Sequence, residues 1–133
     1  MSQENVEVVR RTLEVFGREG SAGSFAGLLT DDLKVQPAFE VTGGESFVGA
    51  DGFMLFMGQW TEAFDAWAFE VVEILDADDK VVARLRQTAR GKASGTPVEL
   101  PFGVVFRFRD RLIARMDFYL TESEALEAVG LKE

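Results

Sequence analysis

The segment "LIARMDFYL" (residues 112–120) places a carboxylate, Asp117, and a phenol, Tyr119, in a run of otherwise strand-like residues. A carboxylate inside a pocket can act as a general base and abstract a proton from a carbon next to a carbonyl group. The same carboxylate on the wet side of a sheet is an ordinary surface charge. The direction of Asp117 therefore decides whether this segment could do chemistry.

The residue types that the chain lacks narrow the possible reactions. It has no Cys and no His, which excludes disulfides, thiolate chemistry, Cys/His zinc sites and Ser-His-Asp catalysis. Adjacent acids occur at 31–32 and 78–79, in predicted turns where carboxylates are usually solvated. We predict no metal site and no cofactor, so an acid or base would have to be a carboxylate, Tyr or Lys.

Composition predicts one globular domain over residues 1–133. Hydrophobic residues make up 47% of the chain, twelve of them Phe, which is enough for a packed core. The formal net charge is −9, which argues against binding nucleic acid or anionic membranes. The chain opens on an amphipathic stretch and has no apolar run near the ~20 residues needed to span a bilayer. We therefore expect a soluble cytoplasmic protein.

Apolar residues recur every three or four positions in the first half of the chain, which predicts helices. One helix begins near Ser2. A second, "FAGLL", is capped by Ser24. A third is capped by Asp51 and carries an aromatic face. Before it, the glycine-rich stretch 38–52 lacks the Gly-Lys-Ser/Thr ending of a phosphate-binding loop, so we predict an irregular connection.

After Phe64 the apolar pattern changes to alternation, which predicts strands separated by turns. Helices that segregate from an antiparallel sheet make the chain α+β. A capping box of Thr121 with Glu124 begins a final helix, and Gly130 ends it. The predicted strands are 33–37, 67–75, 80–93, 98–109 and 112–120.

This order of elements, with "ENVEVVRRTLEVF", "GADGF", "SGTPVELPFGVVFRFRDRLIARMDFYL" and "EALEAVGL", resembles the SnoaL-like, polyketide-cyclase-related group of the nuclear transport factor two-like superfamily. The resemblance covers nearly the whole chain. It implies a cystatin-like cone, in which a curved antiparallel sheet wraps around N-terminal helices and encloses a pocket. Members include ketosteroid isomerases, limonene epoxide hydrolases, scytalone dehydratases and polyketide cyclases, as well as binding domains without activity.

Alternation along the strand 98–109 separates a Phe-rich face, which we expect to be the inner one, from a face with Arg107 and Arg109. Two hairpin registers are then possible. A loop of 110–111 pairs Val104 with Asp117 and points Asp117 inward. A loop of 109–111 with a bulge pairs Val104 with Met116 and points Asp117 outward. The Phe-rich face consists of Leu100, Phe102, Val104, Phe106 and Phe108.

Burial favours the second register, because the first would place Arg115 and Asp117 inside an aromatic wall. The resemblance agrees, since the position of the family's inward acid falls here on Phe118. A polar residue that relatives often carry on the preceding strand is replaced by Val104.

In the strand 80–93, Arg84, Arg86 and Arg90 share one face, which we expect to lie outside and to pair with carboxylates such as Glu70, Glu99 or Asp117. Gln87 lies on the other face and would be the one polar group that this strand turns into the pocket.

Three hypotheses follow. The first is a protein that binds a small hydrophobic or aromatic ligand in an apolar pocket; the second is an enzyme of the cyclase, isomerase or hydratase type with Asp117 and Tyr119 as catalytic residues. The third is an interaction module, a homodimer through the convex sheet face at Val105, Arg107 and Arg115 and the row of Arg84 and Arg86. The predicted ligand-binding residues are Phe16, Trp60, Phe64, Gln87, Phe102, Val104, Phe106, Met116 and Phe118.

Overall fold

The computed structural model describes residues 2–37 and 47–131, and most of the predicted irregular connection 38–52 lies outside these residues. Helices come first, strands dominate the second half, and a short helix follows them. The elements are α1 (Ser2–Glu19), η1 (Ala22–Leu28), β1 (Leu29–Pro37), β2 (Phe47–Val48), α2 (Gly49–Trp60), β3 (Phe64–Ala77), β4 (Lys80–Gly91), β5 (Pro97–Arg109), β6 (Leu112–Tyr119) and α3 (Glu122–Ala128).

The six strands form one sheet in the order β2-β1-β6-β5-β4-β3. The antiparallel meander predicted for β3 to β6 is confirmed. The sheet departs from the antiparallel arrangement at one place, where β1 pairs with β6 in parallel. This pairing closes the sheet beside the helices and brings the N-terminal strand next to the last one.

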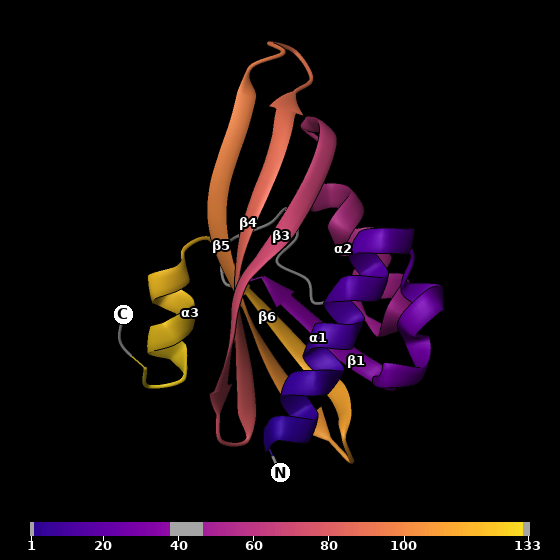
Figure 1. The fold of residues 1–133 in the computed structure, drawn as a ribbon. Coiled ribbons are helices and arrows are strands. Elements are labelled where there is room, and N and C mark those ends of the chain that lie inside the picture. The colour runs from indigo at the N-terminus through magenta and orange to yellow at the C-terminus, as the bar shows by residue number, and fades with distance from the viewer. Residues whose placement is uncertain (1, 38–46, 132–133) are drawn as a thin grey trace.

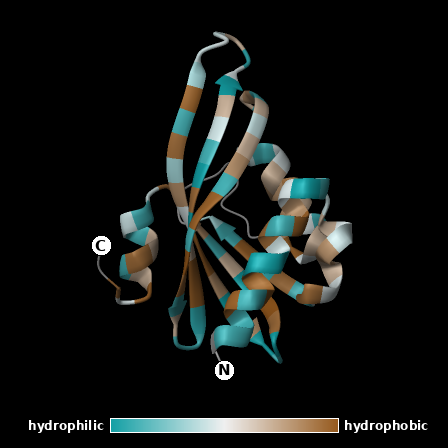
Figure 2. Ribbon diagram, in the orientation of Figure 1, coloured by the Kyte–Doolittle hydropathy of each residue, from teal (hydrophilic) through white to brown (hydrophobic). Residues whose placement is uncertain are grey.

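The sheet curves around α1 and α2, which lie on its concave side, whereas α3 lies on the opposite, convex side (Figure 1). Hydrophobic and hydrophilic residues alternate along several strands, most clearly along β5 (Figure 2). The main core fills the space between the concave face and α1, η1 and α2. A smaller cluster lies under α3.

Two predicted helix starts are wrong. The cap of η1 is Ser21, whose hydroxyl accepts a hydrogen bond from the Gly23 amide, and not Ser24. Helix α2 begins at Gly49, and its N-cap, Val48, makes no side-chain cap. Gly49 has a φ of +74°, and a Cβ there would lie 3.3 Å from the Asp31 carbonyl oxygen. The chain therefore enters α2 through a glycine turn, and Asp51 falls in the first turn, where a carboxylate suits the helix dipole.

The hairpin between β5 and β6 combines a short loop with a bulge. Asp110 and Arg111 form a two-residue turn with φ values of 53° and 69°, the left-handed conformations that such a turn requires. The register then shifts between Arg107 and Phe108, and beyond the shift Val104 pairs with Phe118. Both pairings predicted from sequence are wrong, the one with Asp117 by one residue and the one with Met116 by two, because neither combined the short loop with a bulge.

Two further details concern the ends of elements. Leu100, predicted on the inner face, is exposed, and its strand rises with β4 beyond the end of α2 (Figure 1). The capping role of Thr121 is confirmed, since its hydroxyl accepts a hydrogen bond from the Glu124 amide. Among the described residues, no helix is both long enough and apolar enough to cross a membrane.

Candidate functional site: an apolar cavity and an outer cleft

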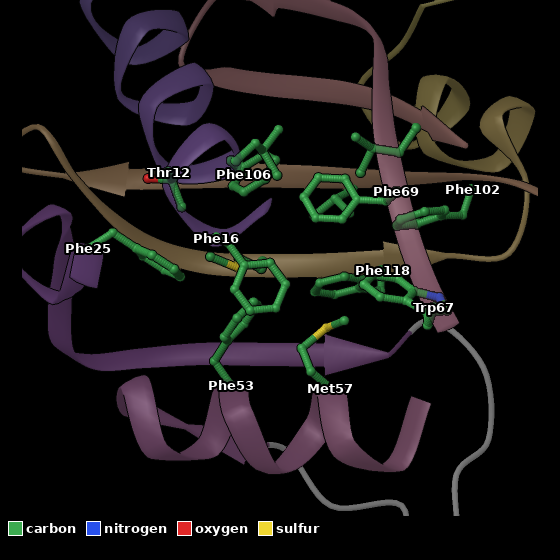
Figure 3. Close-up of a pocket in the computed structure, with 14 residues that line it drawn as sticks. Thr12, Phe16, Phe25, Phe53, Met57, Trp67, Phe69, Phe102, Phe106 and Phe118 are labelled. Carbon is green, nitrogen blue, oxygen red and sulfur yellow. The ribbon is translucent and has the colours of Figure 1, made fainter. Parts of the chain in front are cut away.

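A cavity of about 30 Å³ lies between the concave face of the sheet and the helices α1, η1 and α2. Figure 3 shows its aromatic side chains converging from both sides. The side chains that line it carry no charge. They are Thr12, Leu13, Phe16, Phe25, Phe53, Met57, Trp67, Phe69, Leu85, Phe102, Val104, Phe106, Met116 and Phe118.

Aromatic contacts fix the shape of this cavity. The Phe16 ring packs edge-to-face on Phe53 at 5.1 Å between centroids and is nearly parallel to Phe69 at 6.0 Å. Trp67 lies 5.7 Å from Phe69. Such offset and edge-on pairs are the favoured geometries for aromatic rings. Rings from α1, α2 and β3 therefore form one continuous wall.

The polar groups around the cavity are bonded to the protein itself. The Thr12 hydroxyl donates to the Val8 carbonyl oxygen at 2.8 Å. The indole N–H groups of Trp60 and Trp67 both donate to Oε1 of Gln87, at 2.9 and 2.8 Å. The cavity can therefore offer a ligand apolar contacts. A hydrogen bond to the ligand would have to replace one of these internal hydrogen bonds.

A larger cleft of about 360 Å³, called the outer cleft below, lies next to the cavity. It is formed by the C-terminal part of α1, by α2 and by the start of β3. Among the described residues, four line both spaces and lie between them, and we call them the partition: Phe16, Met57, Trp67 and Phe69.

Most of the predicted ligand-binding residues meet at the cavity. Those that line it are Phe16, Phe102, Val104, Phe106, Met116 and Phe118. Trp60 lies behind this lining, 5.4 Å from Phe102 and 5.6 Å from Phe118. Gln87 is turned inward and buried, as predicted, but reaches the cavity through Trp67. Phe64 is not among the lining residues; it lies at the start of β3, opposite Gly91.

Several lining residues were missed, although the sequence carried a signal for some of them. Phe53 and Met57 are four residues apart on α2, on the helix face already predicted to be apolar. Trp67 and Phe69 alternate on β3, which predicts a shared face. Leu13, Phe25 and Leu85 gave only a general apolar signal.

Asp117 and Tyr119, the candidate catalytic pair, lie on the face of the sheet away from the cavity. Asp117 pairs with Val105 across β5 and is only 5% exposed. Its carboxylate accepts hydrogen bonds from Arg115, the shortest at 2.9 Å, and lies 3.7 Å from Nε of Arg107. This is the environment of a buried structural ion pair.

The electrostatic environment on this face stabilises the charged form of Arg115 and the neutral form of Tyr119. The Asp117 carboxylate raises the pKa of the Arg115 guanidinium, mainly through their hydrogen bonds. Burial raises the pKa of the Tyr119 phenol, and the charge of Asp117 raises it further. Tyr119 therefore stays protonated at neutral pH and does not serve as a base there.

Of the three outward arginines, Arg86 pairs with the predicted Glu70 and Glu99, Arg84 pairs with other carboxylates, and Arg90 donates to the Gly95 carbonyl oxygen at 3.2 Å. Arg86 lies 3.2 Å from Glu70 and 3.6 Å from Glu99. Arg84 bonds both Glu73 and Glu122, at 2.6 Å each, and so ties β3 and α3 to β4. In the described part of the chain, no group of three or more acidic side chains could hold a metal ion.

The convex face is also less open than predicted. Val105, predicted to contact a second subunit, is fully buried and clusters with Ala125 and Leu126 of α3. Gly103 explains how the helix comes so close, because a Cβ there would lie 2.5 Å from the Cβ of Ala125. Helix α3 therefore occupies the middle of this face.

The cavity, the curved sheet and the order of elements agree with a match to a family model. Residues 9–116 match the SnoaL-like domain. The chain belongs to the SnoaL-like family. No curated protein matches it at the level of sequence.

Solved structures confirm the fold. A candidate SnoaL-like polyketide cyclase from Jannaschia sp. CCS1 superposes with a TM-score of 0.74 at 20% identity, over 89% of this chain and 85% of that one. TerC, co-crystallised with polyporic acid, gives 0.73 at 18% identity, over 95% and 98%. A protein of ketosteroid isomerase-like fold from Catenulispora acidiphila, in complex with trimethylamine, gives 0.68 at 17% identity, over 94% and 93%.

Proposed function

We propose that this SnoaL-like protein binds a small, uncharged aromatic or hydrophobic molecule between the helices and the concave face of the sheet. The observation that carries the proposal is that neither the cavity nor the cleft has a charged residue among its described lining residues, and that aromatic and aliphatic side chains line both. An ionised ligand would lose its hydration there without gaining a partner, whereas a flat apolar one would gain burial and ring contacts.

The ligand binds mainly in the outer cleft, against the partition. Ligand sites generally enclose about 300–1,000 Å³. The inner cavity, at about 30 Å³, holds little more than a water molecule, whereas the cleft has about 360 Å³. Structures of relatives in complex with small molecules, polyporic acid in TerC and trimethylamine in the Catenulispora protein, support small-molecule binding at the level of the fold.

The alternative, an acid–base enzyme, requires an inward carboxylate. Among the described residues, none with a carboxylate lines the cavity or the cleft. Asp117 and Tyr119 belong to the opposite face, so we favour binding over a cyclase, isomerase or hydratase reaction that depends on them.

We also propose a homodimer through the parts of the convex face that α3 leaves open. Arg86, Arg107 and Arg115 remain solvent-accessible there. Light scattering at micromolar concentration should give the mass of a dimer, and the mass of a monomer would contradict this proposal.

The cytoplasmic location and the single domain over residues 1–133 also stay predictions.

A titration that follows Trp fluorescence against 1-naphthol, aromatic polyketides and steroids tests ligand binding. Gly58 lines the cleft on α2, and a Cβ there meets nothing within 4 Å. Gly58→Leu should therefore fill the cleft without strain and weaken binding at least tenfold. Gly27→Leu is the matched control, because Gly27 has equally open surroundings and is not among the residues that line the cleft.

The two substitutions distinguish binding in the cleft from an effect on the protein as a whole. Saturable binding that Gly58→Leu weakens and Gly27→Leu leaves within twofold supports the proposed site. A lack of saturable binding across the panel, or an equal effect of both substitutions, contradicts it.

A further inference from the structure

The Gln87 carboxamide joins two tryptophans that come from different elements. Its Oε1 accepts a hydrogen bond from Trp60, the last residue of α2, and another from Trp67 on β3. Gln87 itself is 6% exposed. Because an indole N–H can only donate and an amide nitrogen cannot accept, these two bonds fix which end of the carboxamide faces the tryptophans.

Of the two tryptophans, only Trp67 lines both the cavity and the cleft. Its ring centroid lies 5.7 Å from that of Phe69, and Phe69 in turn stacks on Phe16, so the three rings form one side of the partition. Trp60 lies behind the lining, against Phe102 and Phe118. The same acceptor therefore holds one side chain of the partition and one side chain of the core.

The backbone before Trp67 is built to direct this side chain. The register between β3 and β4 shifts between Asp65 and Ala68, so Ala66 and Trp67 together lie opposite Ala89. Ala66 has a φ of 53°, a conformation that is unfavourable for a residue other than glycine. Bulges of this kind re-aim a side chain, here the indole of Trp67 toward Gln87.

We infer that Gln87 is a positioning residue that determines ligand size: its Oε1 holds Trp67 in the partition, keeps the inner cavity separate from the cleft, and so limits the site to small ring systems. The inference rests on the proposed function. Without this acceptor, the part-buried indole N–H of Trp67 would lose its hydrogen-bond partner, and the side chain would turn toward water at the edge strand β3. The cavity and the cleft would then join.

Three variants separate the positioning role from a general loss of packing. Gln87→Leu keeps a similar volume and removes the acceptor. Trp67→Phe and Trp60→Phe each remove one indole N–H bond, and only the first of them alters the partition. The affinities for 1-naphthol and the larger 1-hydroxypyrene are measured by fluorescence for each folded variant.

Gln87→Leu and Trp67→Phe should shift the ratio of the two dissociation constants at least tenfold in favour of 1-hydroxypyrene, whereas Trp60→Phe should leave it within twofold. An unchanged ratio in Trp67→Phe, or an equal shift in both tryptophan variants, overturns the inference. If Gln87→Leu does not fold, Gln87→Met, another apolar side chain of similar length without the amide oxygen, takes its place.

Hydrogen exchange of the indole N–H signals, followed by nuclear magnetic resonance, provides a readout without ligand. The Trp67 signal should be protected in the native protein and should exchange at least tenfold faster in Gln87→Leu. Equal exchange in both proteins overturns the inference. If the exchange data agree but neither naphthol nor hydroxypyrene binds the native protein, it is the proposed function that fails.

Discussion

The two faces of the β5–β6 hairpin are built from alternate residues of the same strands, yet they differ in almost every property. The concave face presents Phe106 and Phe118 to an uncharged cavity. The convex face buries Asp117 between arginines and packs Val105 under α3. The face that carries Asp117 and Tyr119 is thus the structural one, and the proposed ligand site lies on the apolar side.

This difference shows why a lone acid among hydrophobic residues is ambiguous in a SnoaL-like protein. An acid on the convex face can be as buried as one in a pocket when a helix covers the neighbouring residues and arginines satisfy the carboxylate. Burial alone therefore does not identify a catalytic carboxylate; the face on which it lies does.

The largest effect is expected on the concave face. Phe106 is fully buried, and Phe106→Ala should lower the free energy of unfolding by about 3–5 kcal/mol because it removes apolar contacts and enlarges the cavity. Benzene should bind in the new space and recover part of the stability. Chemical denaturation with and without benzene measures both changes, with the exposed Leu55→Ala as control. A loss below about 1 kcal/mol would place Phe106 outside the core.

On the convex face, Asp117→Ala should cost about 2–3 kcal/mol, less than the ~3–5 kcal/mol of a fully buried pair, because both arginines keep access to water. Asp79→Ala is the matched control: its side chain is 82% exposed beside Lys80, and its removal should change stability by less than about 0.5 kcal/mol. Ligand affinity should be unchanged in folded Asp117→Asn. A loss of binding without a loss of stability would assign Asp117 to the ligand site instead.

Gly103→Ala tests the contact between the convex face and α3. The added methyl group would lie 2.5 Å from Ala125, so the helix must move, at a cost of about 1–3 kcal/mol. The double variant with Ala125→Gly should recover most of this loss. Thermal unfolding of the single and double variants measures the coupling, and simple additivity would mean that α3 does not pack on Gly103.

The smallest effect concerns Tyr119, the only tyrosine of the chain. Its folded-state pKa is raised above the ordinary value of 10.0, so the folded state holds the phenolic proton more tightly than the unfolded state. The resulting stability is fully present below about pH 10 and is lost as the pH rises through the folded-state pKa. Absorbance at 295 nm should give a folded midpoint above 10.0. A midpoint below it would indicate the activated phenol of a catalytic site.

The sequence was sufficient for the fold and for the face of most residues, because alternation along β5 is strong and the family resemblance covers nearly the whole chain. It was not sufficient for the hairpin register. Asp110 and Arg111 both adopt left-handed conformations, which Asp tolerates but Arg disfavours, and the packing of both sheet faces fixes the turn. Asp117 still faces outward as predicted, because the bulge restored the alternation of inward and outward side chains along β6.

The polar part of the site was the least predictable. Gln87 was expected to meet a ligand, but two indoles that lie 20 and 27 residues away in the sequence satisfy its oxygen. No local sequence pattern predicts these hydrogen bonds. Conversely, Trp67 looked like an ordinary strand residue, and the bulge at Ala66 that directs it depends on the edge position of β3.

The most direct test of the central claim is a map of backbone and indole chemical-shift changes on addition of 1-naphthol. We expect the largest changes at Phe16, Trp67 and Phe69, around the cleft, and small ones at Asp117 and Tyr119. Changes centred on Asp117 and Tyr119, with the cleft unaffected, would contradict the assignment of binding to the concave face and of structure to the convex one.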